Sequence, residues 1–346
     1  MKAWLLDART FLKCLTLPRL ANLILLKISY LLSVVLHRPL HTGNPAYLSI
    51  EPTGGCNLHC PECPTGLAKT RRKTNFLGEE LYRRIIDKVQ RHALSVSLYF
   101  QGEPFLHPHL ADLIRYASQK KLYTVVSTNG QLLENIDPAE LVQSGISRLI
   151  VCADGMDQET YEKYRVGGNL DKLVMGVKNI SGAKKQLGRS NPHIVLQFLV
   201  MKHNEKDIPG LRQWARAMGA NSLELKSPQL YTMNDEDNRL SSREEFNRYR
   251  KDSRGALSIK SDLPNRCWRM WHASVITCDG AVLPCCFDKN QDHQFGSLHE
   301  FDLEAIWNSE KLMHFRSMVW TQRAAIEICM NCTEGLKIRT GQQFFC

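Results

Sequence analysis

The sequence predicts an α/β fold built as a partial, TIM-like (β/α)6 barrel, with a helical segment before it and a small cysteine-rich α+β domain after it. Three observations predict this organisation. Six short apolar runs alternate with helical patterns from about residue 45, a basic and apolar stretch precedes them, and seven of the twelve cysteines lie beyond residue 262. We therefore divide the 346 residues into a helical segment (1–44), a barrel (45–227), a linker with helical parts (228–261) and a C-terminal unit (262–346).

The N-terminal segment is both basic and apolar. In residues 1–45, six Lys or Arg minus Asp7 give +5, which is half of the formal net charge of +10. Residues 22–36 are largely hydrophobic, but Lys27 interrupts them and they are shorter than the roughly 20 residues that span a bilayer. We expect a buried or interfacial helix, with either peripheral membrane contact through residues 1–45 or a solvated basic face. The protein is expected to be cytoplasmic, with membrane association left open.

Six runs rich in β-branched, leucine or aromatic residues predict the barrel strands. They are 46–51, 95–100, 122–126, 148–152, 193–200 and 222–226. Helical periodicity over 78–92 and 207–218, and a capped helix start at Asp137-Pro138, predict helices between them. Six strands are too few for a closed eight-stranded barrel, so the sheet stays open and ligands bind at the carboxyl ends of its strands.

The first cysteine group follows the first predicted strand. Cys56, Cys60 and Cys63 form a C-x3-C-x2-C triad in EPTGGCNLHCPECP. Three thiolates can hold three irons of a 4Fe–4S cluster and leave the fourth iron without a protein ligand. A structural zinc site usually has four ligands, so zinc with His59 as the fourth is the alternative interpretation.

With this triad the sequence resembles the radical S-adenosylmethionine (radical SAM) superfamily. Four further blocks extend the resemblance over about 150 residues: QGEP at 101–104, STNG at 127–130, VCADG at 151–155 and LVMKHN at 199–204. Arg165 lies downstream of the third of these blocks, where the family has an arginine.

The resemblance implies a site for S-adenosylmethionine beside the cluster. Glu103 would contact the amino group of the methionine moiety. Cys152 stands where the family has a serine, and together with Arg165 it would hold the carboxylate. Glu62 stands where the family often has an aromatic residue. The implied cofactor-binding residues are Gly102, Glu103, Ser127, Asn129, Cys152, Arg165 and Leu199.

The second cysteine group lies in the C-terminal unit. Its spacing suggests one site, formed by Cys267, Cys285, Cys329 and Cys332, with CDGAVLPC as a β-hairpin that has an Asp-Gly turn. The unit resembles the SPASM/Twitch extensions of radical SAM enzymes, which implies one auxiliary 4Fe–4S cluster. Four thiolates also suit zinc. The roles of three further cysteines stay open: Cys278, Cys286 and Cys346.

The resemblance implies reductive cleavage of S-adenosylmethionine to a 5′-deoxyadenosyl radical that abstracts hydrogen from a substrate, with an electron donor such as flavodoxin or ferredoxin. We expect oxidation or cross-linking of a peptide or protein side chain. The alternatives are dehydrogenation of a small or lipid-linked molecule and, in another class, a non-catalytic zinc-binding interaction protein. Asp279, Asp288 and His293 are base candidates, and their other interpretation is turn and surface residues. Nucleic acid is not expected as a partner, because the basic residues are not interleaved with aromatics.

Overall fold

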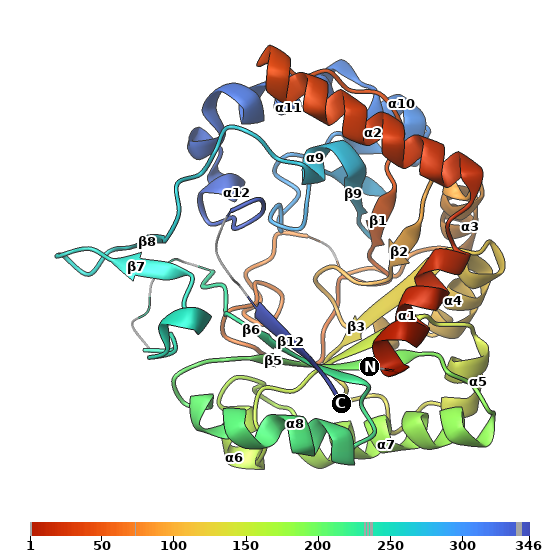
Figure 1. The fold of residues 1–346 in the computed structure, drawn as a ribbon, viewed down its shortest axis with the longest axis vertical. Coiled ribbons are helices and arrows are strands. Elements are labelled where there is room, and N and C mark those ends of the chain that lie inside the picture. The colour runs from red at the N-terminus through yellow and green to blue at the C-terminus, as the bar shows by residue number, and fades with distance from the viewer. Residues whose placement is uncertain (1, 73, 232, 234, 236–237, 337–340) are drawn as a thin grey trace.

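The computed structural model describes residues 2–72, 74–231, 233, 235, 238–336 and 341–346, and it has the predicted α/β architecture (Figure 1). Six consecutive parallel strands form its centre. They are β1 (Tyr47–Ile50), β2 (Ser95–Ser97), β3 (Tyr123–Thr128), β4 (Arg148–Cys152), β5 (His193–Leu199) and β6 (Ser222–Lys226). All six predicted strands are present. The second is shorter than predicted and ends at Ser97, although Leu98 N still donates a hydrogen bond to the Val125 carbonyl oxygen of β3 at 2.7 Å.

Helices lie around the outside of this curved sheet (Figure 1). They are α3 (Glu79–Val89), α4 (Leu110–Gln119), α5 (Pro138–Gln143), α6 (Gln158–Glu162), α7 (Leu170–Gln186) and α8 (Ile208–Ala217). The Asp137 carboxylate caps α5 by accepting a hydrogen bond from Ala139 N at 2.8 Å, as Asp-Pro predicts. The apolar face of α3 is fully buried and packs toward α4, which accounts for its helical periodicity.

Two helices precede the barrel: α1 (Lys2–Lys13) and α2 (Leu17–Leu36). Phe11 of α1 and Cys14, which directly follows it, pack against Tyr123, Val125 and neighbouring residues of the central strands. Asp7 pairs with Arg148 and accepts a hydrogen bond from the Tyr123 hydroxyl. The helix α1 therefore covers the amino-terminal side of the barrel, opposite the strand ends where ligands are expected.

The C-terminal unit shares the barrel sheet, which the sequence did not predict. β9 (Ala273–Ile276) pairs in parallel with β1, and β12 (Gly341–Phe345) pairs antiparallel with β6. β10 (Ala281–Leu283) and β11 (Gly296–Ser297) extend the β9 edge. The result is one ten-stranded sheet with β11 and β12 as its edge strands. The C-terminal unit also contains α9 (Arg269–His272), α10 (Leu303–Trp307), α11 (Glu310–Gln322) and α12 (Glu327–Met330).

The turn of the predicted CDGAVLPC hairpin is confirmed. It lies between β9 and β10, and Gly280 has a φ of +81°, a conformation that glycine adopts without strain.

The polar segment 228–261 differs from its prediction as a linker with helical parts. Its described residues contain a single 3-10 turn, Glu244–Phe246, and a hairpin of β7 (Tyr249–Lys251) with β8 (Leu257–Ile259) that projects from the body (Figure 1). Residues 232, 234, 236 and 237 of this segment lie outside the described residues. Its buried apolar residues, including Leu230, Tyr249 and Ile259, form a small cluster of their own, which explains why charge content alone misled the prediction.

Candidate active site

A cavity of about 190 Å3 lies at the carboxyl ends of β1 to β4. Its wall comes from four strand-to-helix loops, the arrangement expected for a ligand site in a parallel sheet. Nine of the residues that the sequence singled out line it: Cys56, Cys60, Cys63, Gly102, Glu103, Ser127, Asn129, Cys152 and Arg165. The tenth, Leu199, packs beside the cavity in a cluster that contains the three cysteines of the first group.

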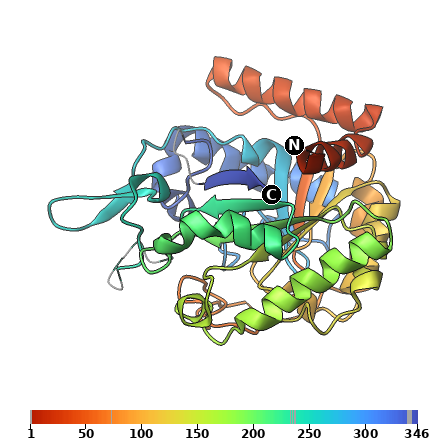
Figure 2. The same ribbon diagram turned by 60° about the horizontal axis from the view of Figure 1, so that its bottom comes forward.

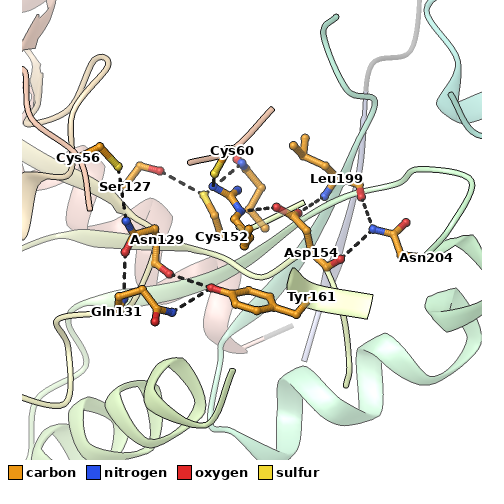
Figure 3. A network of polar contacts seen from close by, with 12 residues as sticks. Cys56, Cys60, Ser127, Asn129, Gln131, Cys152, Asp154, Tyr161, Leu199 and Asn204 are labelled. Carbon is orange, nitrogen blue, oxygen red and sulfur yellow. Dashed lines mark hydrogen bonds and ion pairs between the residues drawn. The ribbon is translucent and has the colours of Figure 1, made fainter. Parts of the chain in front are cut away.

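The cysteine loop is compact and receives hydrogen bonds on two of its sulfurs. Asn129 Nδ2 donates to Cys56 Sγ at 3.8 Å, and Arg165 Nη1 donates to Cys60 Sγ at 3.7 Å (Figure 3). Burial raises the pKa of Cys60 to about 11, so this thiol needs a nearby positive centre to ionise. The iron of a cluster would supply that centre, and hydrogen bonds to sulfur tune iron–sulfur clusters.

The cavity offers groups that an iron–sulfur cluster and an organic cofactor would use. Three thiols line it, and Arg165 lies beside them. The buried Gln101 Oε1 also lines the cavity, has no hydrogen-bond partner and offers an acceptor to a bound ligand. Among the residues that the structure describes, no three His, Cys, Asp or Glu side chains form a group that could hold one metal ion.

The QGEP loop is held by one carboxylate. Glu103 is 2 % exposed, and its oxygens accept hydrogen bonds from Thr128 Oγ1 at 2.7 Å, Asn129 N at 2.7 Å and Phe105 N at 3.1 Å. Burial raises its pKa, and these hydrogen bonds oppose the rise. Glu103 thus joins the loops after β2 and β3 while it lines the cavity, so its part in ligand contact remains a proposal.

Replacement of Gly102 by alanine is expected to displace this loop. A Cβ here would lie 2.1 Å from the Thr53 carbonyl oxygen and 2.6 Å from that of Gly55, and neither backbone can yield without moving the cysteine loop. We expect a loss of about 1–3 kcal/mol in stability and at least roughly tenfold weaker S-adenosylmethionine binding. Thermal unfolding and equilibrium binding measure the two effects.

The control is Gly78→Ala, because a Cβ at Gly78 meets nothing within 4 Å. Unchanged cofactor affinity in Gly102→Ala would show that the close approach does not shape the site.

Arg165 is positioned by a residue whose role the sequence did not reveal. Asp154 is fully buried, and its Oδ2 accepts a hydrogen bond from Arg165 Nε at 2.6 Å. Burial disfavours the guanidinium charge, but Asp154 and Cys60 hold the pKa of Arg165 above its usual range. The arginine therefore stays cationic beside the cysteine loop and can pair with an anionic ligand group.

A second set of missed residues supports the same strand ends. Leu199 N donates to Asp154 Oδ1 at 2.7 Å, and Asn204 Nδ2 donates to the carbonyl oxygens of Asp154 and Leu199, both at 2.9 Å (Figure 3). Asp154 and Asn204 stand inside the VCADG and LVMKHN blocks. Their position in these blocks is the sequence signal that could have identified them as site residues, but only the tertiary contacts show what they bind.

The cysteines predicted for the second site also gather in space, although they come from four positions in the chain. Burial and the neighbouring Cys286 thiol raise the pKa of Cys285, and Cys332 and Cys267 act in the same direction. Burial raises the pKa of Cys329 to about 11, with Cys267 adding to it. Cys346 lies apart, directly after β12, and its Sγ is 4.0 Å from the Arg212 carbonyl oxygen.

Two arginines, the buried Arg323 and the half-buried Arg269, face this second cysteine group. Arg323 is fully buried and donates to Cys332 Sγ at 3.6 Å. The thiols of Cys286 and Cys285 raise the pKa of Arg269 although burial opposes its charge. The Nε atoms of both arginines are buried without a hydrogen-bond partner. Cations placed against four thiols fit an anionic iron–sulfur cluster, whose charge they would balance.

The base candidates do not reach the cavity. Asp288 is fully buried and accepts hydrogen bonds from Asp292 N at 2.8 Å and His293 N at 3.0 Å, which close a turn. Asp279 accepts from the Thr277 hydroxyl at 2.5 Å and from Gln291 at 3.0 Å. Their contacts match the turn interpretation of these residues.

A second cavity, of about 240 Å3, lies between the polar segment and the C-terminal unit, and Tyr231, Phe287 and Lys289 are among its lining residues. Burial lowers the pKa of Lys289, while Cys63, Cys286 and Glu62 favour its charged form. Lys289 therefore lies near cysteines of both groups. Glu62 pairs with Arg239 and accepts a hydrogen bond from Tyr231 N at 2.6 Å, which ties the first cysteine loop to the polar segment.

Comparison with known proteins identifies two domains. The sequence model of the radical SAM superfamily matches residues 50–215, and that of the SPASM iron–sulfur cluster-binding domain matches residues 267–333. A PqqA peptide cyclase of Granulibacter bethesdensis is 25% identical over 308 residues, covering 83% of this chain and 79% of the relative. The tungsten-containing aldehyde ferredoxin oxidoreductase cofactor-modifying protein of Pyrococcus furiosus is also 25% identical, over 319 residues, covering 83% of this chain and 87% of the relative.

Solved structures share the fold. SuiB of Streptococcus suis bound to S-adenosylmethionine has a TM-score of 0.59 and 16% identity, covering 89% of this chain and 76% of SuiB. BtrN in complex with AdoMet and 2-DOIA has a TM-score of 0.56 and 19% identity, covering 87% of this chain and 97% of BtrN.

Proposed function

We propose that this chain, which belongs to the radical SAM superfamily and carries a SPASM domain, oxidises or cross-links a peptide side chain. The radical SAM domain binds S-adenosylmethionine and a 4Fe–4S cluster, and the SPASM domain binds iron–sulfur clusters. The proposal rests on one observation: nine of the ten residues that we expect to bind the first cluster and S-adenosylmethionine line the same cavity. When bound, the cofactors supply a radical that takes a hydrogen atom from the substrate and an acceptor for the electron left behind. An electron donor such as flavodoxin or ferredoxin would provide the initial reduction.

The residues assigned to cofactor binding follow from the cavity. Cys56, Cys60 and Cys63 would hold the first cluster. Arg165, fixed by Asp154, would hold the carboxylate of S-adenosylmethionine. Gln101 Oε1 would accept a hydrogen bond from an N–H or O–H group of the same cofactor. The second cysteine group would hold the auxiliary cluster through Cys267, Cys285, Cys329 and Cys332.

The second cavity supports a substrate position between the two cysteine groups. Lys289 lines it, close to Cys63 and Cys286, and its ammonium group lies 5.5 Å from the Tyr231 ring centre. A lysine in this position would pair with an acidic group of the substrate. Support for a peptide comes from the PqqA peptide cyclases, with which this chain aligns over 83% of its length.

The test is anaerobic reconstitution with iron, sulfide, S-adenosylmethionine and dithionite. We expect formation of 5′-deoxyadenosine and, with short peptides encoded beside the gene, a product that has lost two hydrogen atoms. Mass spectrometry with fragmentation would locate the altered side chain. Turnover of small-molecule alcohols or amines with no peptide modified would favour the dehydrogenase alternative. A colourless protein that binds only zinc would remove the enzyme proposal.

A further inference from the structure

The helix α2 has its polar side turned inward and its apolar side turned outward. Its buried residues are Arg19, Asn22, Leu26, Ser29 and Ser33. On the other side, Ile24, Leu25, Ile28, Leu31, Leu32 and Val35 are 46–71 % exposed. A surface helix of a globular protein has the opposite arrangement. In Figure 2 the helix lies along the upper edge of the molecule, with the barrel on one side only.

The inward side is fixed by hydrogen bonds to the barrel. Arg19 is 2 % exposed and donates to the carbonyl oxygens of Gln90 at 2.6 Å, Lys120 at 2.9 Å and Lys121 at 2.5 Å. Asn22 Nδ2 donates to Asn44 O at 2.9 Å. These bonds tie α2 to segments 22 to 102 residues away. The orientation is therefore set by specific contacts, and the apolar side is exposed as a consequence.

The chain segment that contains α2 carries positive charge and no negative charge. No Asp or Glu occurs from residue 8 to residue 50, while Arg9, Lys13, Lys27 and Arg38 are exposed in this region. Asp7, which precedes them, is paired with Arg148. An apolar stripe with flanking cations matches the surface of a membrane that contains anionic lipids.

We propose that α2 docks the enzyme on an anionic lipid bilayer, lying in the plane of the headgroups with its apolar side toward the acyl chains. Among the described residues it is the one helix long and apolar enough to cross a bilayer, with a mean hydropathy of 1.7. A span would have to withdraw Arg19 and Asn22 from their bonds and bury both in hydrocarbon. Docking in the plane keeps every one of those bonds.

This docking leaves the active site accessible. The helix α1 covers the amino-terminal side of the barrel strands, and the cavity lies at their carboxyl ends. The membrane-facing residues lie outside both cavities. Substrate entry therefore does not require release from the membrane.

The test is flotation of the reconstituted holoenzyme with phosphatidylcholine vesicles and with vesicles of phosphatidylcholine and phosphatidylglycerol. We expect binding to the anionic vesicles that weakens as the salt concentration rises. Ile28→Gln/Leu31→Gln should weaken binding by about tenfold or more. Its matched control is Met175→Gln/Phe301→Gln, at two apolar residues of similar exposure outside α2, and should bind as the wild type does.

Formation of 5′-deoxyadenosine should be the same in both variants, which verifies that they are folded. The proposal is overturned if the wild type stays with the unbound fraction, or if both variants bind equally well. It is also overturned if gel filtration shows a dimer that Ile28→Gln/Leu31→Gln converts to a monomer, because a second copy would then cover α2.

Discussion

Alanine at Cys56, Cys60 and Cys63 together is expected to remove one cluster and all cleavage of S-adenosylmethionine. These three sulfurs line the main cavity, and Asn129 and Arg165 donate hydrogen bonds to two of them. The iron content should fall from about eight to about four per chain, because the C-terminal group is untouched. The measurements are iron analysis, Mössbauer spectroscopy and chromatography of 5′-deoxyadenosine, which should fall to background.

The matched control is Cys346→Ala. This thiol follows β12 and lies beside Arg212, apart from both cysteine groups, and its loss should leave iron content and 5′-deoxyadenosine formation unchanged. A triple alanine variant that still forms 5′-deoxyadenosine would contradict the assignment of the first cluster and with it the proposed chemistry.

Much of the barrel was predictable because its signals are local. Each parallel strand is a short apolar run, and each following loop carries a motif at the carboxyl end of its strand. Topology then brings those ends together, so residues as distant as Cys56 and Arg165 meet in one cavity without any further sequence signal. The Asp-Gly turn before β10 was predictable for the same reason, since two residues specify it.

The parts that sequence analysis missed depend on contacts between distant segments. The pairing of β9 with β1 and of β12 with β6 joins strands more than a hundred residues apart, and neither edge strand has a distinctive pattern. Asp154 gains its role only when Arg165 folds onto it. Composition predicted an apolar helix near the N-terminus, but the bonds of Arg19 to carbonyls of the barrel decide which side faces outward.

Glu62 and Lys289 lie where the first cysteine loop meets the polar segment and the C-terminal unit. Glu62 immediately precedes Cys63 and binds the polar segment through Tyr231 N, and Lys289 lies near both Cys63 and Cys286. A substrate held by Lys289 would therefore lie close to both proposed clusters. This arrangement supports separate roles for them, with the first initiating the reaction and the second accepting an electron.

Alanine at Cys329 and Cys332 is accordingly expected to separate the two halves of the reaction. The iron content should fall to about four per chain, while 5′-deoxyadenosine still forms because the first cavity is intact. Oxidised product should fall by at least about a hundredfold, a loss of roughly 3 kcal/mol in transition-state stabilisation. The ratio of product to 5′-deoxyadenosine measures the separation.

The ratio of product to 5′-deoxyadenosine is also insensitive to partial unfolding, which this double substitution promotes. Arg323 is fully buried and donates to Cys332 Sγ, so loss of this thiol removes one of its buried hydrogen-bond partners at a cost of about 1–3 kcal/mol. Misfolded chains yield neither compound and do not alter the ratio, and Cys346→Ala again serves as the control. A wild-type ratio at about four irons per chain would rule out the auxiliary cluster as electron acceptor and leave it a structural role.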